Sequence, residues 1–215
     1  KGVHISPFSD TRPQPLIGVA GRTILDNSLE LLKSSGINDI FVVVGHKREK
    51  LIETLQEHDH DGLNIHHVEQ KQNRGIGNAV LQVKNKISPG EYFLLLYGDI
   101  ITADNIFSKI QQSFHAFKSP VASICLPPSN QEFGNVFLNA QMEITKIVEK
   151  PKSNKLGNYV LAGVFILPAS FFELLESNGS SMEKALKKMV AGDGLRASMW
   201  EDEWLDVVRP WEILM

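Results

Sequence analysis

The hydrophobic pattern of the chain alternates between short, unbroken apolar runs and stretches in which apolar residues recur every three or four positions. The first pattern predicts strands buried on both faces, and the second predicts amphipathic helices. From the amino end the expected elements are a helix over 23–35, a strand over 39–45, a helix over 48–57, a strand over 64–68, a helix from about 79 to 86, a strand over 92–97 and a helix that begins near Thr102. Strands that alternate with helices in this way predict an α/β fold with a doubly wound, mostly parallel sheet.

The second half of the chain has a different pattern. Strands are expected over 133–138, 143–148 and 160–167, with turns and no helix between them. Such a series adds an antiparallel excursion to the parallel core and makes the sheet mixed. Helices over 169–176 and 181–191 and a strand over 196–200 are expected to follow. The first fifteen residues contain prolines at positions 7, 13 and 15 and no periodic pattern, which predicts an extended, functional loop.

Length and composition narrow the class of protein. With 215 residues, 42% of them hydrophobic, the chain can form one substantial core, so a single domain over residues 1–215 is expected. A net charge of −3 argues against a nucleic-acid or an anionic-membrane partner. No apolar run approaches the roughly 18 residues that span a bilayer, and no signal-peptide pattern opens the chain, so a cytoplasmic location is expected. The single cysteine, Cys125, lies in an apolar run and is expected to be a buried thiol.

The strand over 92–97 ends abruptly at Gly98 and Asp99. The carboxylate therefore follows the carboxyl end of a strand, and in open α/β sheets ligands bind outside that edge. An aspartate in this place can hold a hard cation, while the preceding glycine lets a ligand approach the backbone. The alternative is that the two residues form only a turn with a helix cap, since a helix is expected next.

Several separated segments lie at expected strand ends or in the loops beside them. They are residues 11–16 (TRPQPL), Gln70 with residues 75–77 (GIG), residues 97–99 (YGD), residues 149–151 (EKP), and residues 204–206 (WLD) with 210–214 (PWEIL). In their order and spacing these segments resemble the sugar-phosphate nucleotidylyltransferases, also called nucleoside-diphosphate-sugar pyrophosphorylases. The resemblance covers nearly the whole chain. It implies a Rossmann-like domain that transfers a nucleotidyl group from a nucleoside triphosphate to a sugar 1-phosphate and releases pyrophosphate.

The resemblance gives two aspartates a catalytic role. Asp99 and Asp206 match the pair that holds a divalent cation in the family, and Mg²⁺ is the expected cofactor. The ion would bridge the phosphates and stabilise the charge of the departing pyrophosphate, in a reaction that otherwise depends on positioning. Both residues follow apolar strands, so both can reach one crevice. The alternative for Asp206 is an ordinary surface turn.

The remaining site residues come from the same resemblance. Gln70 matches the residue that reads the base edge, favouring a pyrimidine and leaving guanine open, and Gly75 lets the base approach the backbone. Glu149 matches the acceptor for sugar hydroxyls, and Lys150 matches the catalytic lysine that binds the sugar's phosphate. Backbone positions expected to line the substrates are Gly2, Gly98, Gly134 and Gly163. Each of these assignments has a purely structural alternative. The glycines at 75 and 77 would start a helix, residues 149–150 would form a solvated turn, and Gly134 and Gly163 would be bulge glycines in strands.

Departures from the family pattern concern the expected phosphate site. His4 occupies the place of an arginine and Gln14 that of a lysine, so two permanent positive charges are missing. Since loss of one preorganised charge-stabilising group costs about 2.7–4 kcal/mol in the barrier, catalysis is expected to be slower by orders of magnitude. Val208 replaces a glycine, and the family's first strand is missing ahead of Lys1, which predicts further residues before it.

These departures support an alternative function: a catalytically impaired relative that binds nucleotide or nucleotide sugar and regulates a partner subunit. A homo-oligomer is compatible with either function, and the tryptophans near the carboxyl end can face a partner chain or a further domain. A glycosyltransferase normally has an Asp-x-Asp at the central strand, and residues 99–101 (DII) do not supply one. The histidines and aspartates of residues 58–67 are spaced around a turn and on both faces of a strand, so no metal site is expected there.

Overall fold

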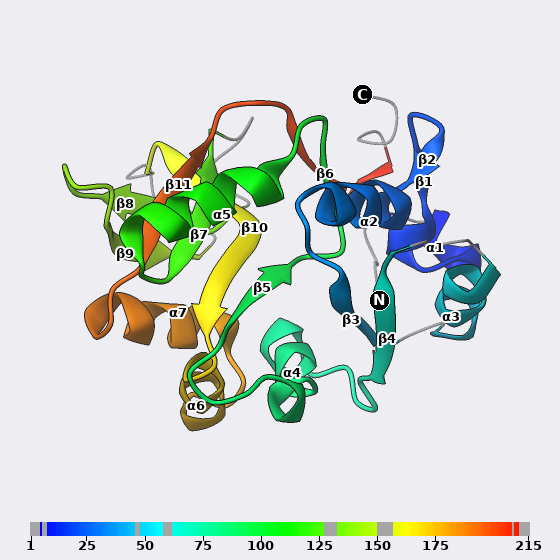
Figure 1. Ribbon diagram of the computed structural model, residues 1–215, viewed down its shortest axis with the longest axis horizontal. Helices are drawn as coiled ribbons and strands as arrows, with labels where there is room; N and C mark the ends of the chain where they lie inside the picture. Colours follow the sequence, from blue (N-terminus) through cyan, green and yellow to red (C-terminus); the bar gives the residue numbers. More distant parts are fainter. Residues whose placement is uncertain are drawn as a thin grey trace. The chain divides into compact units, whose positions relative to one another are not determined.

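The computed structural model describes residue 5 and residues 8–45, 48–57, 62–126, 133–149, 157–207 and 209–210, and the chain is drawn in Figure 1. Its residues form two compact units. The first unit comprises Lys1–Asn73, Tyr97–Asn105 and Glu203–Met215, and the second comprises Arg74–Leu96 and Ile106–Asp202. Three stretches far apart in the sequence therefore build the first unit.

The first unit combines helices with pairs of short strands (Figure 1). Its elements are α1 (Phe8–Thr11), η2 (Gln14–Leu16), β1 (Gly18–Val19), β2 (Arg22–Thr23), α2 (Ile24–Ser34), β3 (Asp39–Val44), α3 (Arg48–Glu57), β4 (Asn64–Glu69), β6 (Ile100–Thr102) and β12 (Trp204–Asp206). Strands β3 and β4 run parallel, with Asp39 opposite Asn64 and Val44 opposite Glu69. Strands β6 and β12 pair antiparallel, as do β1 and β2.

Three expectations for this unit are wrong in detail. The first fifteen residues contain α1 and the start of η2 instead of an extended loop. Pro15 has the fixed φ that suits the first turn of η2. The helix predicted from Thr102 begins only at Ile106, because residues 100–102 pair with β12 and form β6. Strand β3 is packed against the apolar core on one face only, through Ile40, Val42 and Val44. Its other face is therefore half-exposed.

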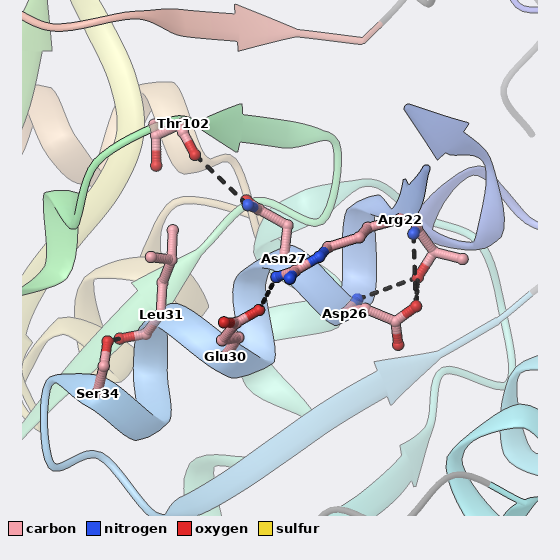
Figure 2. Close-up of polar contacts among 8 residues, drawn as sticks. Arg22, Asp26, Asn27, Glu30, Leu31, Ser34 and Thr102 are labelled. Carbon is pink, nitrogen blue, oxygen red and sulfur yellow. Dashed lines mark hydrogen bonds and ion pairs between the residues drawn. The ribbon is translucent and has the colours of Figure 1, made fainter. Parts of the chain in front are cut away.

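Helix α2 begins at a capping box and supports β6. The hydroxyl of Thr23 accepts from the backbone N–H of Asp26 at 3.0 Å, and the Asp26 carboxylate in turn accepts from the Thr23 N–H at 3.4 Å. Figure 2 shows Asn27 reaching from the helix toward β6, where its Nδ2 donates to the carbonyl of Thr102 at 3.5 Å. Asn105, just after β6, donates to a carbonyl in the last turns of α2 at 3.0 Å. Side-chain hydrogen bonds thus join α2 to the last residue of β6 and to Asn105, three residues further on.

The second unit is built on one sheet. Its elements are α4 (Ile76–Leu81), η3 (Lys84–Lys86), β5 (Tyr92–Leu96), α5 (Ile106–Phe117), β7 (Val121–Cys125), β8 (Asn135–Leu138), β9 (Ile144–Val148), β10 (Tyr159–Pro168), α6 (Phe171–Ser177), α7 (Met182–Ala191) and β11 (Arg196–Trp200). The strand order is β11-β7-β10-β8-β9, with β5 also paired to β10. The β7–β11 pair is parallel, and β10 runs antiparallel to β5, β7 and β8.

The predicted α/β class, with a mixed sheet and an antiparallel excursion through β8, β9 and β10, is confirmed. Helix α5 lies across β7, β10 and β11 (Figure 1). Strand β7 is buried along its whole length, and Cys125 is buried within it as expected. Strand β5 is only half-buried instead of covered on both faces, and its first residue, Tyr92, is exposed and packs on the ring of Phe114.

The contact between α4 and the turn before α7 provides a test of packing in this unit. A Cβ on Gly77 would overlap the backbone carbonyl of Ser180, so only glycine allows this approach. We expect Gly77→Ala to lower the free energy of unfolding by about 1–3 kcal/mol, because backbone has to move to admit the methyl group. Urea denaturation measures the change. Gly192→Ala is the matched control, since a Cβ there meets its nearest atom at an ordinary 3.5 Å, and an equal loss in both variants would contradict the argument.

Candidate functional site

The structure brings Asp99 and Asp206 together in the first unit. Asp206 is the last residue of β12 and lies opposite Ile100, the residue that follows Asp99. The backbone N–H of Val207 donates to the carbonyl of Asp99 at 2.8 Å, which extends the ladder by one more pair. The two aspartates therefore occupy neighbouring positions of one two-stranded ladder. Gly98 and Asp99 form a turn that leads into β6, so the alternative of a helix cap does not apply.

An apolar cluster fixes the strands that carry the two aspartates. Val207 is fully buried and packs with Ile5, Ile17 and Ile24, and Leu205 and Ile101 pack against the same cluster. A β-strand alternates its faces, so the neighbours of Asp206 on either side point into the core. The carboxylate itself is half-buried, with its Oδ1 atom shielded from solvent. The site thus combines rigid backbone support with partly desolvated carboxylates.

Burial changes the acidity of Asp99. Removal of its carboxyl group from water raises its pKa above the ordinary value, and a hydrogen bond from the backbone of the same residue offsets part of this rise. The charged form is therefore held in an unfavourable environment. A cation next to it would relieve that cost.

The donor set fits a hard divalent cation. Asp99 and Asp206 offer carboxylate oxygens, which Mg²⁺ prefers, and no group of three or more histidine, cysteine or acidic side chains suited to a metal occurs among the described residues. Two carboxylates are the number that Mg²⁺ often takes from a protein, because it keeps waters and substrate phosphates as its other ligands. Closed structural metal sites, which need about four protein ligands, do not match this arrangement.

The pKa of Asp99 predicts how stability depends on pH. An acid whose pKa is higher in the folded than in the unfolded chain disfavours folding once it is ionised, so stability falls as pH rises from the unfolded toward the folded pKa. We expect Asp99→Asn to remove this dependence and to raise the metal-free melting temperature at pH 7. Thermal unfolding between pH 3 and 8 in a chelator tests this. Asp104→Asn, which changes an exposed carboxylate nearby, is the control and should leave the dependence in place.

Gln14 lies beside the two aspartates and bonds to the backbone that carries them. Its Nε2 donates to the carbonyl of Val207 at 2.6 Å, so both backbone polar groups of that buried residue are bonded, one to Gln14 and one to Asp99. The next residue of η2, Pro15, lies with its Cγ 3.6 Å from the place of a Cβ on Gly98. The chain at η2 thus contacts both aspartate segments. The Gln14 amide is thus bonded to the residue that follows β12.

Gln70 lies at the carboxyl edge of the β3–β4 pair. It follows β4 directly, and its backbone N–H donates to the carbonyl of Val44 at 2.8 Å. Its side-chain Oε1 lies 3.7 Å from the place of a Cβ on Gly45, the residue after β3. Because parallel strands end at the same edge, Gln70 is placed where ligands bind in open α/β sheets.

Gly75, in the second unit, precedes α4 with a φ of 87°. A positive φ of this kind suits glycine. Gly75 is the N-cap residue of α4, which agrees with the alternative that it is a helix-start glycine.

The residues expected at the sugar gather in the second unit. A Cβ on Gly134 would lie 2.8 Å from Oε2 of Glu149, so the carboxylate rests directly on the glycine. The carbonyl of Gly134 accepts from the N–H of Leu161 in β10 at 3.0 Å. Gly163 has a φ of 78° and lies where the β10–β7 register shifts, so it is a bulge glycine. Gly134 and Glu149 are thus in contact. Gly163 lies in β10 two residues after Leu161, whose N–H donates to Gly134.

Some predicted residues lie outside the described part of the chain. These are Gly2, His4, Lys150, Val208, residues 58–61 and residues 211–214. Of the histidine-rich segment, His66 is described, and it pairs with Asp39 at 3.1 Å and stacks on Phe41. Trp200 is buried in β11 and does not face outward, which corrects the expectation of a partner surface at that tryptophan.

The structure is thus that of an α/β protein with two aspartates on one ladder, a glutamine at the carboxyl edge of a parallel pair, and a mixed sheet. Comparison with known proteins gives the family: residues 1–211 match the nucleotidyl transferase family, and the chain belongs to it. No helix among the described residues is long and apolar enough to cross a membrane.

Two curated relatives show the range of the sequence similarity. The bifunctional protein GlmU of Methanococcus maripaludis strain C7 is 33% identical over 221 residues, which cover 100% of this chain and 51% of that protein. Mannose-1-phosphate guanylyltransferase 1 of Arabidopsis thaliana is 24% identical over 216 residues, or 97% of this chain and 59% of that protein. The chain therefore spans about half the length of the curated relatives it matches.

Solved structures show the same fold. A UDP-glucose pyrophosphorylase from Acinetobacter baumannii superposes with a TM-score of 0.84 at 19% identity, covering 99% of this chain and 87% of that one. A glucose-1-phosphate thymidylyltransferase described for Bacillus anthracis gives a TM-score of 0.89 at 16% identity, covering 99% and 88%. Similarity at this level of identity establishes the fold and leaves the substrates to other arguments.

Proposed function

We propose that this chain transfers a nucleotidyl group from a nucleoside triphosphate to a sugar 1-phosphate, releasing pyrophosphate and forming a nucleotide sugar. The observation that carries the proposal is the ladder that sets Asp206 opposite Ile100 and bonds Val207 to Asp99. It brings two segments far apart in the sequence together, and in this proposal their two carboxylates would share one cation. Family membership supports the same reaction, since its members named above act on sugar phosphates and nucleotides.

Each described site residue has a task in this reaction. Asp99 and Asp206 would hold Mg²⁺, which supplies charge neutralisation at the phosphates when it is bound. Gln70 would hydrogen-bond the edge of the base with its amide, and Gly75 would leave room for the base at the backbone. Glu149 would accept hydrogen bonds from sugar hydroxyls and orient the sugar phosphate for attack in line with the leaving pyrophosphate. Lys150, assigned from the sequence, would neutralise the sugar's phosphate.

The position of Gln14 favours a second candidate function. Glutamine is neutral and so carries no positive charge for the phosphates, and its amide donates to the carbonyl of Val207. A chain that binds nucleotide or nucleotide sugar without efficient turnover, and that regulates a partner subunit, would tolerate this change. Binding without pyrophosphate release is the property that separates this function from the first.

A pyrophosphate-release assay distinguishes the two. We expect release that requires both a sugar 1-phosphate and a nucleoside triphosphate, tested with glucose 1-phosphate and mannose 1-phosphate against UTP, dTTP and GTP in the presence of Mg²⁺. Calorimetry with the same compounds measures binding independently of turnover. Tight binding of a triphosphate with no pyrophosphate release from any pair would reject the enzyme and support the regulatory relative.

A further inference from the structure

Asn135, the first residue of β8, has a fully buried side chain that the reaction described above does not use. A buried amide needs hydrogen-bond partners, because leaving it without them costs about 1–3 kcal/mol. Its Oδ1 accepts from the backbone N–H of Gly157 at 2.9 Å, and its Nδ2 donates to the carbonyl of Phe133 at 3.1 Å. The donor and acceptor character of these two partners fixes which end of the amide faces which.

One partner of Asn135, Phe133, is next to a residue expected to bind the sugar. Phe133 precedes Gly134, on which the carboxylate of Glu149 rests, so the bond to its carbonyl shapes the bend that presents this glycine. In the ladder between β8 and β9, Asn135 lies opposite Val148, the residue before Glu149. The backbone of Asn135 therefore lies beside the end of β9, where Glu149 follows.

At Gly157 the chain lies against β8 again. A Cβ on it would lie 2.6 Å from the carbonyl oxygen of Val136, so glycine alone permits this approach to β8. The chain thus leaves β8 and β9 at Glu149 and returns to the start of β8 at Gly157. Residues 150–156 between these anchors lie outside the described part.

We propose that Asn135 is a positioning residue for sugar binding: it sets where Glu149 stands and where the chain after it returns. The proposal rests on the proposed function and deepens it, because it assigns a determinant of sugar-phosphate affinity that makes no contact with substrate itself. Misplacement of a binding group by about 1 Å can cost about 10²-fold in rate, so loss of this support should act on the sugar substrate. Gln70, which is assigned to the base, is in the other unit.

Two variants and one control test the proposal. Asn135→Leu keeps the approximate volume and removes both hydrogen bonds. Asn135→Asp keeps the acceptor for Gly157 and removes the donor to Phe133, and it serves if the first variant does not fold. Ser198→Ala is the control, because the buried Ser198 lies in the same sheet but far along the chain from β8, and its loss removes a hydrogen bond with the hydroxyl of Ser113 at 2.8 Å.

The readouts are the KM values of both substrates and hydrogen exchange of the peptides covering residues 133–149 and 157–160. We expect the KM for the preferred sugar 1-phosphate to rise about tenfold to 10²-fold, with the triphosphate KM within about twofold, and exchange to quicken in the Asn135 variants only. Faster exchange with both KM values unchanged would reduce Asn135 to a structural residue and overturn the proposal. An equal rise of both KM values, or the same change in Ser198→Ala, would overturn it too.

The two proposals fail in different ways. If the unaltered protein releases no pyrophosphate and binds no sugar 1-phosphate in calorimetry, the proposed function is rejected. The proposed role of Asn135 in sugar binding is then rejected as well. If the unaltered protein turns over and the Asn135 variants match it, the function stands and the inference about Asn135 alone is wrong.

Discussion

Replacing Asp206 with asparagine should lower the rate of pyrophosphate release by about 10²–10³-fold, the size expected when a preorganised group that stabilises transition-state charge is removed. An amide keeps the shape of the side chain and can still bond to its surroundings, but it carries no charge for a divalent cation. The bonds of Val207 to Asp99 and Gln14 are made by backbone atoms of Val207 and should survive. The effect is therefore expected in catalysis and metal affinity, and not in folding.

Binding of Mn²⁺, followed by electron paramagnetic resonance, measures metal affinity without turnover. We expect Asp206→Asn to weaken it, and Asp99→Asn to weaken it equally if both carboxylates share one ion. Asp202→Asn is the matched control, because Asp202 is an exposed acid four residues before Asp206 in the sequence. Unaltered metal affinity and rate in Asp206→Asn would place the cation elsewhere and remove the main support for the proposed mechanism.

The second large effect is a gain. Gln14→Lys should raise kcat/KM by about tenfold or more, because it restores one of the two positive charges missing from the phosphate site, each worth about 2.7–4 kcal/mol when fully in place. A lysine ammonium also donates hydrogen bonds, so it can keep the contact with the carbonyl of Val207 that Gln14 makes at 2.6 Å. The gain should increase further when His4→Arg is added.

Two companion variants separate charge from support. Gln14→Met keeps the length of the side chain and removes the donor, so it should weaken Mn²⁺ binding and stability by leaving a buried carbonyl without its partner. Gln72→Lys adds the same charge at an exposed position and should leave the rate unchanged. A Gln14→Lys variant no faster than the parent would show that residue 14 acts through its bond to β12 alone, which agrees with the regulatory candidate.

Local patterns in the sequence determine much of this protein. The spacing of Leu25, Leu29 and Leu32 predicts α2 to within one residue at each end, and the helix predicted over 48–57 is α3. Helices depend on contacts three and four residues apart, so their signal lies within a short window. Strand positions in the second unit follow for a similar reason, since alternating or continuous apolar runs identify them.

The pairing of segments far apart was decided only in the tertiary structure. Residues 100–102 read as the approach to a helix, and they become β6 because β12 supplies a partner from the other end of the chain. The half-exposed strands β3 and β5 also could not be predicted from the sequence, since an apolar run does not tell how many faces of a strand are covered.

The candidate site likewise has features that the sequence predicts and features that only the fold decides. The sequence, through the resemblance it carries, predicted the chemical groups of the site: two carboxylates for a cation, an amide for the base edge and a charged pair for the sugar. Only the fold decided that the Gln14 amide donates to the carbonyl of Val207, and that Asn135 ties Gly157 to β8. Those bonds join residues whose separation along the chain leaves no periodic trace, so packing of whole elements had to bring each donor to its acceptor.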